Sequence, residues 1–293
     1  MMFWVRHVTA YTYSDPVDLS THLLHLKPRA LPGQRVIQAR IRALPAPDHV
    51  TETHDHFGNA ATRLYIARPH MHFEVHAEAL VEVDLPTPPP PETTLPWEEV
   101  ARLAAEGAGE CAMAAEFSFG SAQAPVLAAA TEFARASFPP GRPILAGLLD
   151  LNSRIMREFT FQAGVTSIST PVEEVLRMRR GVCQDFTHLM LSALRGLGLP
   201  ARYVSGYIRT RPLPGQQRRR GADQSHAWVG AWMGPDHGWV DLDPTNSLVV
   251  KEEHVVLAHG RDFQDISPVR GVILGGGQHR LSVSVDLEPE GGN

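Results

Sequence analysis

The first third of the chain alternates apolar and polar residues with the two-residue period of half-buried β-strands. Residues 35–44 (RVIQARIRAL) place Ile37 and Ala39 on one face and arginine and glutamine on the other, and residues 72–85 (HFEVHAEALVEVDL) repeat the pattern. Glycine and proline turn signals separate such runs, and no helical spacing of apolar residues precedes the end of the second run. The pattern predicts a small all-β domain over residues 1–85, folded as a sandwich.

A proline-rich segment marks the point at which this period changes. Residues 85–97 (LPTPPPPETTLPW) contain four consecutive prolines, which favour extended polyproline II and act as a semi-rigid spacer. Beyond them, apolar residues recur at helical spacing, most clearly over residues 143–159. We therefore assign residues 86–97 to a linker, residues 98–287 to a second domain and residues 288–293 to a frayed tail.

The middle of the second domain contains two successive helix signals. Thr170, Pro171 and Glu173 are the residue types of a helix N-terminus, and Gly181 is expected to end that helix. A second, strongly apolar helix is expected to begin at Cys183. Helices followed by strands predict an α+β domain in which an antiparallel sheet packs against a central helix. The strand-like runs are residues 201–208, 225–233, 238–245 and 279–287.

Composition narrows the class of protein. The 293 residues are 43% hydrophobic and carry a formal net charge of −5, so the chain lacks the basic excess that nucleic acids and membrane surfaces attract. No run approaches the ~18 apolar residues of a membrane span, and the first residues do not read as a signal peptide. Two cysteines exclude a disulfide framework, so we expect free thiols, a cytoplasmic protein, and neither a nucleic-acid nor a membrane partner.

Three residues of the second domain have the types that nucleophilic catalysis needs. Cys183 falls at the expected start of the apolar helix, where unpaired amides and the positive end of the helix dipole favour a thiolate. His226 lies on the second expected strand, and Asp243 on the next strand could orient its imidazole. Asp241 would point to the same side of that strand and is the alternative. The pattern does not fix the register of the two strands, so it leaves the assembly of these residues open.

Three segments around these residues resemble the core blocks of the transglutaminase-like superfamily, whose fold is papain-like. They are GVCQDFTHLMLSALRGLGLPARYVSGY, SHAWVGAW and GWVDLDPTN. The resemblance implies Cys183 as the nucleophile, His226 as the general base and Asp243 as the residue that orients the imidazole. Residues 3–85, with RHVTAYTYSDPVDLSTHLLHLKPR and DHFGNAATRLYI, are similar to the N-terminal β domain of bacterial members. Together these segments cover most of the chain.

The resemblance implies thiol-dependent acyl transfer from a peptide or another amide-bearing substrate, through a thioester on Cys183. We expect hydrolysis, as in a cysteine protease or amidase, because no feature of the sequence marks a binding site for an acceptor amine. The alternatives are a protein transglutaminase that uses an acceptor amine, and a non-catalytic module that binds a peptide or protein partner on the same fold. The chain has no match to the acidic calcium loops of animal transglutaminases, and we expect no metal and no cofactor.

The remaining candidate residues are expected to be structural. Cys111 lacks such flanking blocks and should pack as a small apolar side chain, and Asp185 should stabilise the start of the apolar helix. Five arginines between residues 209 and 220 should form a polar loop, with a lid that attracts acidic substrate as the alternative. Three pairs of histidines should lie on solvated strand faces and not bind a metal: His22 and His25, His54 and His56, and His70 and His72.

Overall fold

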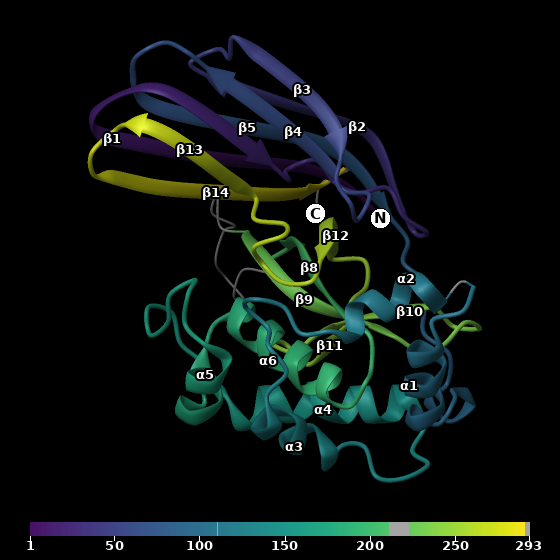
Figure 1. Ribbon diagram of the computed structural model, residues 1–293. Helices are drawn as coiled ribbons and strands as arrows, with labels where there is room; N and C mark the ends of the chain where they lie inside the picture. Colours follow the sequence, from purple (N-terminus) through teal and green to yellow (C-terminus); the bar gives the residue numbers. More distant parts are fainter. Residues whose placement is uncertain (110, 211–222, 291–293) are drawn as a thin grey trace, which may run out of the picture.

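The computed structural model describes residues 1–109, 111–210 and 223–290. Within these residues, the N-terminal part of the molecule is one seven-stranded antiparallel sheet around the long strand β1 (Figure 1). The strand order is β2-β5-β1-β4-β3, and β13 and β14 also pair with β1. The strands are β1 (Met2–Leu24), β2 (Gln34–Leu44), β3 (His49–His54), β4 (Ala60–Ile66), β5 (His70–Val83), β13 (Val269–Gly275) and β14 (His279–Pro289).

Strand β1 belongs to both layers of a sandwich because its two halves pair with different neighbours. Its first half pairs with β5 and β14, whereas residues 20–24 pair with β4 and β13, and the register against β5 shifts between Thr12 and Val17. Side chains of β1, β4 and β5 then share one apolar core, which includes Val17, Leu64 and Phe73. The β sandwich that the sequence predicts is therefore present, and it is built from a single bent sheet.

The last strands of the chain complete this N-terminal sheet. β14 pairs with β1 from Phe3 opposite Pro289 to Tyr13 opposite His279, and β13 pairs with the second half of β1. The sequence pattern placed residues 279–287 in the second domain and residues 288–293 in a tail. The observed pairing corrects the first assignment and, for Glu288 and Pro289, the second, whereas residues 291–293 lie outside the described residues. The physical reason is that alternation identifies the two faces of a strand but does not identify its neighbour.

The rest of the described chain surrounds a five-stranded antiparallel sheet of order β11-β10-β9-β8-β12. Helix α6 (Cys183–Gly196) packs at its centre, with every residue from Asp185 to Arg195 buried. This part is an α+β, papain-like core, as predicted. Its other helices are α1 (Trp97–Glu106), α2 (Cys111–Ala115), α3 (Ala128–Arg135), α4 (Ile144–Glu158) and α5 (Val172–Met178). Its strands are β8 (Ala201–Ile208), β9 (Gln224–Trp232), β10 (Trp239–Asp243), β11 (Leu248–Val249) and β12 (His254–Gly260), with a short parallel pair β6 (Thr160–Phe161) and β7 (Arg180–Gly181).

Helix α5, which precedes the cysteine helix, begins and ends differently from the sequence prediction. Arg179, not Gly181, ends it in the left-handed conformation, with a φ of 55°. Thr170 does not cap its start, because the Thr170 hydroxyl accepts the backbone N–H of Ser167 at 2.9 Å. Gly181 serves a close approach instead: a Cβ there would lie 2.7 Å from Oδ2 of Asp185 in the first turn of α6.

Two side-chain amides of the N-terminal part bind the edge strand β12. Gln34 donates from Nε2 to the carbonyl of Val256 at 2.8 Å and accepts the Val256 N–H at 2.8 Å. Asn59 makes the same pair of hydrogen bonds with the backbone of His259, at 2.7 and 2.8 Å. Both amides are buried. They take the place of a neighbouring strand on the outer edge of β12, and so join the two parts of the chain by sheet-like hydrogen bonds.

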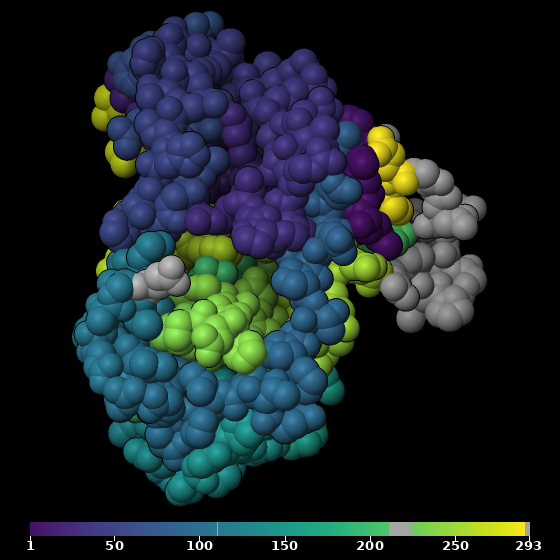
Figure 2. Space-filling model, turned by 90° about the vertical axis from the view of Figure 1, so that its right-hand side faces the viewer, coloured from purple at the N-terminus to yellow at the C-terminus, as the bar shows by residue number. Residues whose placement is uncertain are grey.

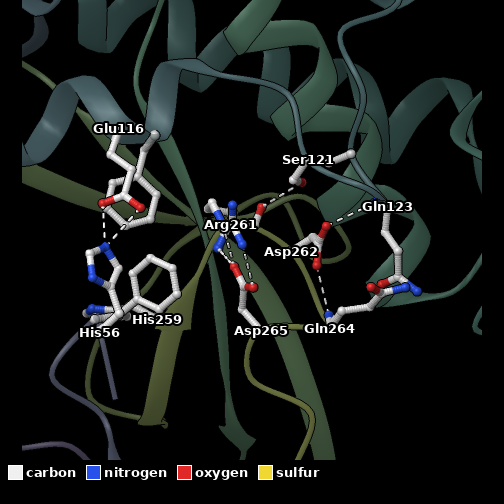
Figure 3. A network of polar contacts seen from close by, with 12 residues as sticks. His56, Glu116, Ser121, Gln123, His259, Arg261, Asp262, Gln264 and Asp265 are labelled. Carbon is white, nitrogen blue, oxygen red and sulfur yellow. Dashed lines mark hydrogen bonds and ion pairs between the residues drawn. The ribbon is translucent and has the colours of Figure 1, made fainter. Parts of the chain in front are cut away.

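Polar contacts near this junction are shown in Figure 3. His56 of the N-terminal part lies 2.9 Å from Oε2 of Glu116, but both side chains are exposed, so this pair contributes little. Arg195, at the buried end of α6, donates to the carbonyls of Ala201 and Arg261 at 2.8 and 2.6 Å, and so fixes the loop that follows β12.

Among the helices that the structure describes, none is long and apolar enough to cross a membrane. Most of the arginine-rich segment, residues 211–222, lies outside the described residues.

Candidate active site

Cys183 is the first residue of α6, and Val182 is the N-cap. The carboxylate of Asp185 accepts the Val182 N–H and the Thr166 hydroxyl, each at 2.7 Å. Burial raises the pKa of Asp185, and these two hydrogen bonds oppose the rise. Asp185 therefore stabilises the start of the helix, as the sequence predicts, and fixes the backbone that carries Cys183.

The backbone N–H of Cys183 is free to bind a ligand. Within the described part of the chain no hydrogen bond to this amide is found, and the helical ladder begins with Phe186, whose N–H donates to the Val182 carbonyl at 3.1 Å. An unpaired amide at the positive end of a buried helix favours negative charge beside it. The Cys183 side chain, which is half-buried, lies at this end of the helix.

His226 and Asp243 come together on neighbouring strands. His226 lies on β9 and Asp243 ends β10, and Nε2 of His226 is 2.8 Å from Oδ2 of Asp243. Burial by itself lowers the pKa of His226, but the hydrogen bonds and charges of Asp243 and Cys183 outweigh it and raise the pKa to about 10. The thiol of Cys183 is thus near enough to the imidazole to favour its protonated form. Because Nε2 faces Asp243, Nδ1 is the ring nitrogen left for the thiol.

Asp243 is fully buried and is surrounded by hydrogen-bond donors. Its Oδ1 accepts the backbone N–H groups of Thr245 and Asn246 at 3.0 and 3.3 Å. Its Oδ2 accepts the Asn246 side-chain amide at 2.7 Å, in addition to His226, and Nε2 of His254 lies 3.4 Å away. Burial raises the pKa of this carboxyl, but the hydrogen bonds from His226 and His254 outweigh burial and hold the pKa well below its usual range. The carboxylate is thus ionised and aimed at the imidazole.

Asp241, the alternative to Asp243, has different partners. Its Oδ2 accepts the indole N–H of Trp228 at 3.0 Å, and its Oδ1 lies 3.7 Å from the guanidinium of Arg202. Trp228 is fully buried, with its ring 6.1 Å from that of His226. The structure therefore brings Asp243 to His226 and gives Asp241 the role of holding the tryptophan beneath the imidazole.

His254 is the member of this cluster that the sequence analysis missed. It begins β12, is 3% exposed, and packs edge-on against Trp228 with the ring centroids 5.2 Å apart. No family block that the sequence showed reaches this position. The available signal was only the apolar run HVVLAHG (254–260), which reads as a buried strand that follows the Asp243 turn.

His226, Asp243 and His254 are also the one group of the described residues whose ligand atoms could share a metal ion, since these atoms lie within 4.8 Å of one another. A metal there would have to displace the hydrogen bond between His226 and Asp243. The donors around Asp243 already use both of its oxygens, which favours a hydrogen-bonded carboxylate over a metal ligand.

The other candidates lie away from this cluster. Cys111 begins α2 and packs against the main apolar core, as expected. The histidine prediction is wrong for His22, His25 and His70, which are all buried. His22 stacks on Phe73 with the ring centroids 3.8 Å apart, and burial, together with His70, lowers the pKa of His22 to about 4. His22 therefore fills the sandwich as a neutral group.

Comparison with known proteins identifies the class to which this fold and site belong. The family pattern of the bacterial transglutaminase-like N-terminal region matches residues 3–82, and that of the transglutaminase-like superfamily matches residues 139–244. The chain belongs to the transglutaminase-like superfamily.

Relatives extend this likeness to the whole chain. An uncharacterised protein of Mycobacterium tuberculosis is 38% identical over 295 residues, which cover 97% of this chain and 92% of that protein. A protein-glutamine gamma-glutamyltransferase of Pseudomonas aeruginosa is 30% identical over 119 residues, which are 40% of this chain and 18% of that enzyme. The solved structure of a candidate cysteine protease from Cytophaga hutchinsonii superposes with a TM-score of 0.76 at 19% identity, over 100% of this chain and 92% of that one. This last likeness shows that the two proteins share a fold.

Proposed function

We propose that the protein is a thiol enzyme that transfers acyl groups from amide or peptide substrates through a thioester on Cys183. The observation that carries the proposal is the 2.8 Å hydrogen bond between His226 and Asp243, on a ring that also interacts with the Cys183 thiol. A thiol, a base and a group that orients the base are the minimum that nucleophilic catalysis by cysteine requires.

The chemistry follows from these positions. His226 accepts the thiol proton, and the Cys183 sulfur forms a bond to the carbonyl carbon of the substrate. The amide of Cys183 can donate to the oxyanion that results. His226 then returns the proton to the leaving nitrogen as the carbon–nitrogen bond breaks, which leaves a thioester. Water, losing a proton to His226, attacks the thioester, and the acid is released as the thiol is restored.

Hydrolysis is the favoured outcome because none of the described residues around His226 marks a site for an acceptor amine. Transfer to an amine needs only a different nucleophile in the last step, so the same residues would serve a transglutaminase. The partners of the protein are then peptides or proteins that present a carboxamide or a peptide bond.

The test separates acylation from the fate of the acyl group. The protein is incubated with casein and with short glutamine-containing peptides, with and without hydroxylamine. Released ammonia reports acylation of Cys183 by a glutamine side chain, new glutamate and new peptide ends report hydrolysis, and hydroxamate reports amine transfer. Cys183→Ala should abolish every product, and Cys111→Ala is the matched control that should keep them. No thioester and no product with any substrate, while Cys183 still alkylates rapidly, would contradict the proposal and favour a binding module.

A further inference from the structure

A cavity of about 560 Å³ lies at the junction of the two parts of the chain. Its walls include residues 29–32 and 85 of the N-terminal part, residues 86–89 of the linker, and residues 237–241 before and within the start of β10. Figure 2 shows this face of the molecule, hollowed below the purple N-terminal sheet, with the yellow-green residues of the second sheet at its floor. Cys183, His226 and Asp243 do not line the cavity, so it is distinct from the candidate active site.

One guanidinium in the wall is incompletely paired. Arg202 stacks on the ring of Trp239 at 4.3 Å, which leaves the edge of its guanidinium open to partners in the ring plane. Asp241 lies 3.7 Å away, farther than a hydrogen bond, and Nε of Arg202 has no hydrogen-bond partner in the described part of the chain. Burial lowers the pKa of Arg202 to about 10, with Asp241 opposing the fall. Removing the Arg202 guanidinium from water with so few hydrogen-bond partners costs free energy, unless a further hydrogen-bond acceptor is present.

A second guanidinium adds to the positive charge of the wall. Arg29 uses one nitrogen, Nη1, to donate to the Phe57 carbonyl and to Oδ1 of Asn59, both at 2.8 Å. Within the described residues it has no ion pair closer than 4.0 Å, and Asp55 acts on it only from a longer distance. His259 contributes no charge, because burial and then the two arginines hold its pKa well below the usual value. The two guanidinium groups and the carboxylate of Asp241 thus give the lining one excess positive charge, to which His237, also in the lining, adds when it is protonated.

Most of the rest of the lining is apolar. The linker contributes three prolines, the N-terminal part contributes Leu31 and Leu85, and the second sheet contributes Val249 and Val250. A concave site of this size with a few polar groups in an apolar wall is typical of small-molecule binding sites. The ligand that matches it combines an apolar body with one negative charge.

We propose that this cavity binds a small organic monocarboxylate, with the carboxylate on the edges of Arg202 and Arg29 and the apolar body against the proline linker. A carboxylate matches the fork of a guanidinium in geometry. A monoanion matches the single excess charge, whereas a phosphate dianion would also face the carboxylate of Asp241.

Calorimetric titration of the purified protein tests the proposal with phenylacetate, benzoate and 4-methylvalerate as probes. Phenylacetamide is the neutral control for phenylacetate, and inorganic phosphate is the control for anion binding alone. We expect at least one carboxylate to bind with a Kd of about 1 mM or below, and phenylacetamide to bind at least about tenfold more weakly. The indole N–H resonance of Trp239, assigned with Trp239→Phe, should shift on binding and so place the ligand in this cavity.

Two kinds of variant test separately whether binding needs the arginine charge and whether it needs the open cavity. Arg29→Met should weaken carboxylate binding about tenfold or more, and Ala30→Trp, at an exposed position of the lining, should do the same by occupying the mouth. Arg177→Met, on the exposed surface of α5, is the matched control and should change nothing. Arg202→Met removes the ion-pair partner of Asp241, so the first two variants carry the test if this variant fails to fold. Equal binding of phenylacetamide, tighter binding of phosphate, or no binding of any carboxylate by the folded protein would each overturn the proposal.

Discussion

His226 Nε2 lies 2.8 Å from Oδ2 of Asp243, and the aspartate two residues earlier on the same strand, Asp241, instead accepts the indole N–H of Trp228 at 3.0 Å. The two carboxylates therefore differ in what they hold, although they share a strand and a direction. They provide a matched pair of positions at which the proposed roles can be tested.

Asp243→Asn is expected to slow the alkylation of Cys183 by iodoacetamide at neutral pH by about tenfold or more. The physical reason is that burial then lowers the pKa of His226 from about 10 with less to oppose it, so an imidazolium no longer accompanies the thiolate. Peptide mass spectrometry reads Cys183 and Cys111 separately over a range of pH. Asp241→Asn should leave the Cys183 profile unchanged, and equal slowing in both variants would contradict the assignment of Asp243.

The stability of the protein should fall with rising pH because of His226. Its pKa is raised from 6.5 to about 10 in the folded chain, so its contribution is fully present below pH 6.5 and is lost as the pH rises through about 10. The slope from this one group is at most about 1.4 kcal/mol per pH unit. Urea unfolding across that window should show the fall in wild type and in the exposed-residue control His72→Gln, and a shallower fall in His226→Gln. An unchanged slope in His226→Gln would refute this origin.

His254→Phe should reduce the reactivity of Cys183 less than Asp243→Asn does, by about threefold to tenfold. Phenylalanine keeps an aromatic ring against Trp228 but removes the Nε2 group that lies 3.4 Å from Asp243, and a contact of that length is weak. His254→Gln restores a donor at a similar reach and should recover part of the loss. The readout is the pH profile of Cys183 alkylation, and a wild-type profile in His254→Phe would show that His254 only fills space.

Gln34→Ala should destabilise the protein by about 2 kcal/mol or more, because it leaves the buried N–H and one hydrogen bond of the Val256 carbonyl without a partner. Gln38→Ala, at an exposed position of the same strand β2, is the control and should change stability by less than about 0.5 kcal/mol. The free energy of unfolding from urea denaturation distinguishes the two. Similar values for both variants would mean that the amide contributes little to the junction.

Local patterns in the sequence predicted the elements that carry the candidate site. The start of α6 at Cys183 and the strands that carry His226 and Asp243 each follow from a few neighbouring residues, namely a glycine turn, an apolar period or an aspartate–proline pair. The local pattern alone did not decide whether Asp241 or Asp243 is the partner of His226. Both aspartates face the same side of a strand, and only the register of β10 against β9 distinguishes them. In that register Leu242 lies opposite Val229, which brings the end of β10 toward His226.

Long-range pairing accounts for what the sequence could not predict. His254 reaches Asp243 only because β12 crosses to the far edge of the sheet beside β8, and no local signal specifies that crossing. His22 was expected to be solvated, yet it shares its face of β1 with the buried residue Leu24, and the buried residue Leu26 follows two positions later, just beyond the strand. The alternation His22, Leu24, Leu26 was a readable signal for an inward-facing histidine. The neutral imidazole then stacks on Phe73, which is a contact between different strands.

The position of β13 and β14 on either half of β1 has a consequence for synthesis on the ribosome. The second residue of the chain, Met2, opens the strand that β14 completes only when Pro289 has been made. During translation the papain-like core can emerge in full while β1 still has an open edge along residues 3–13. The sandwich can therefore close only after β14 has been made, and a chain that stops before residue 269 would expose that edge to other chains.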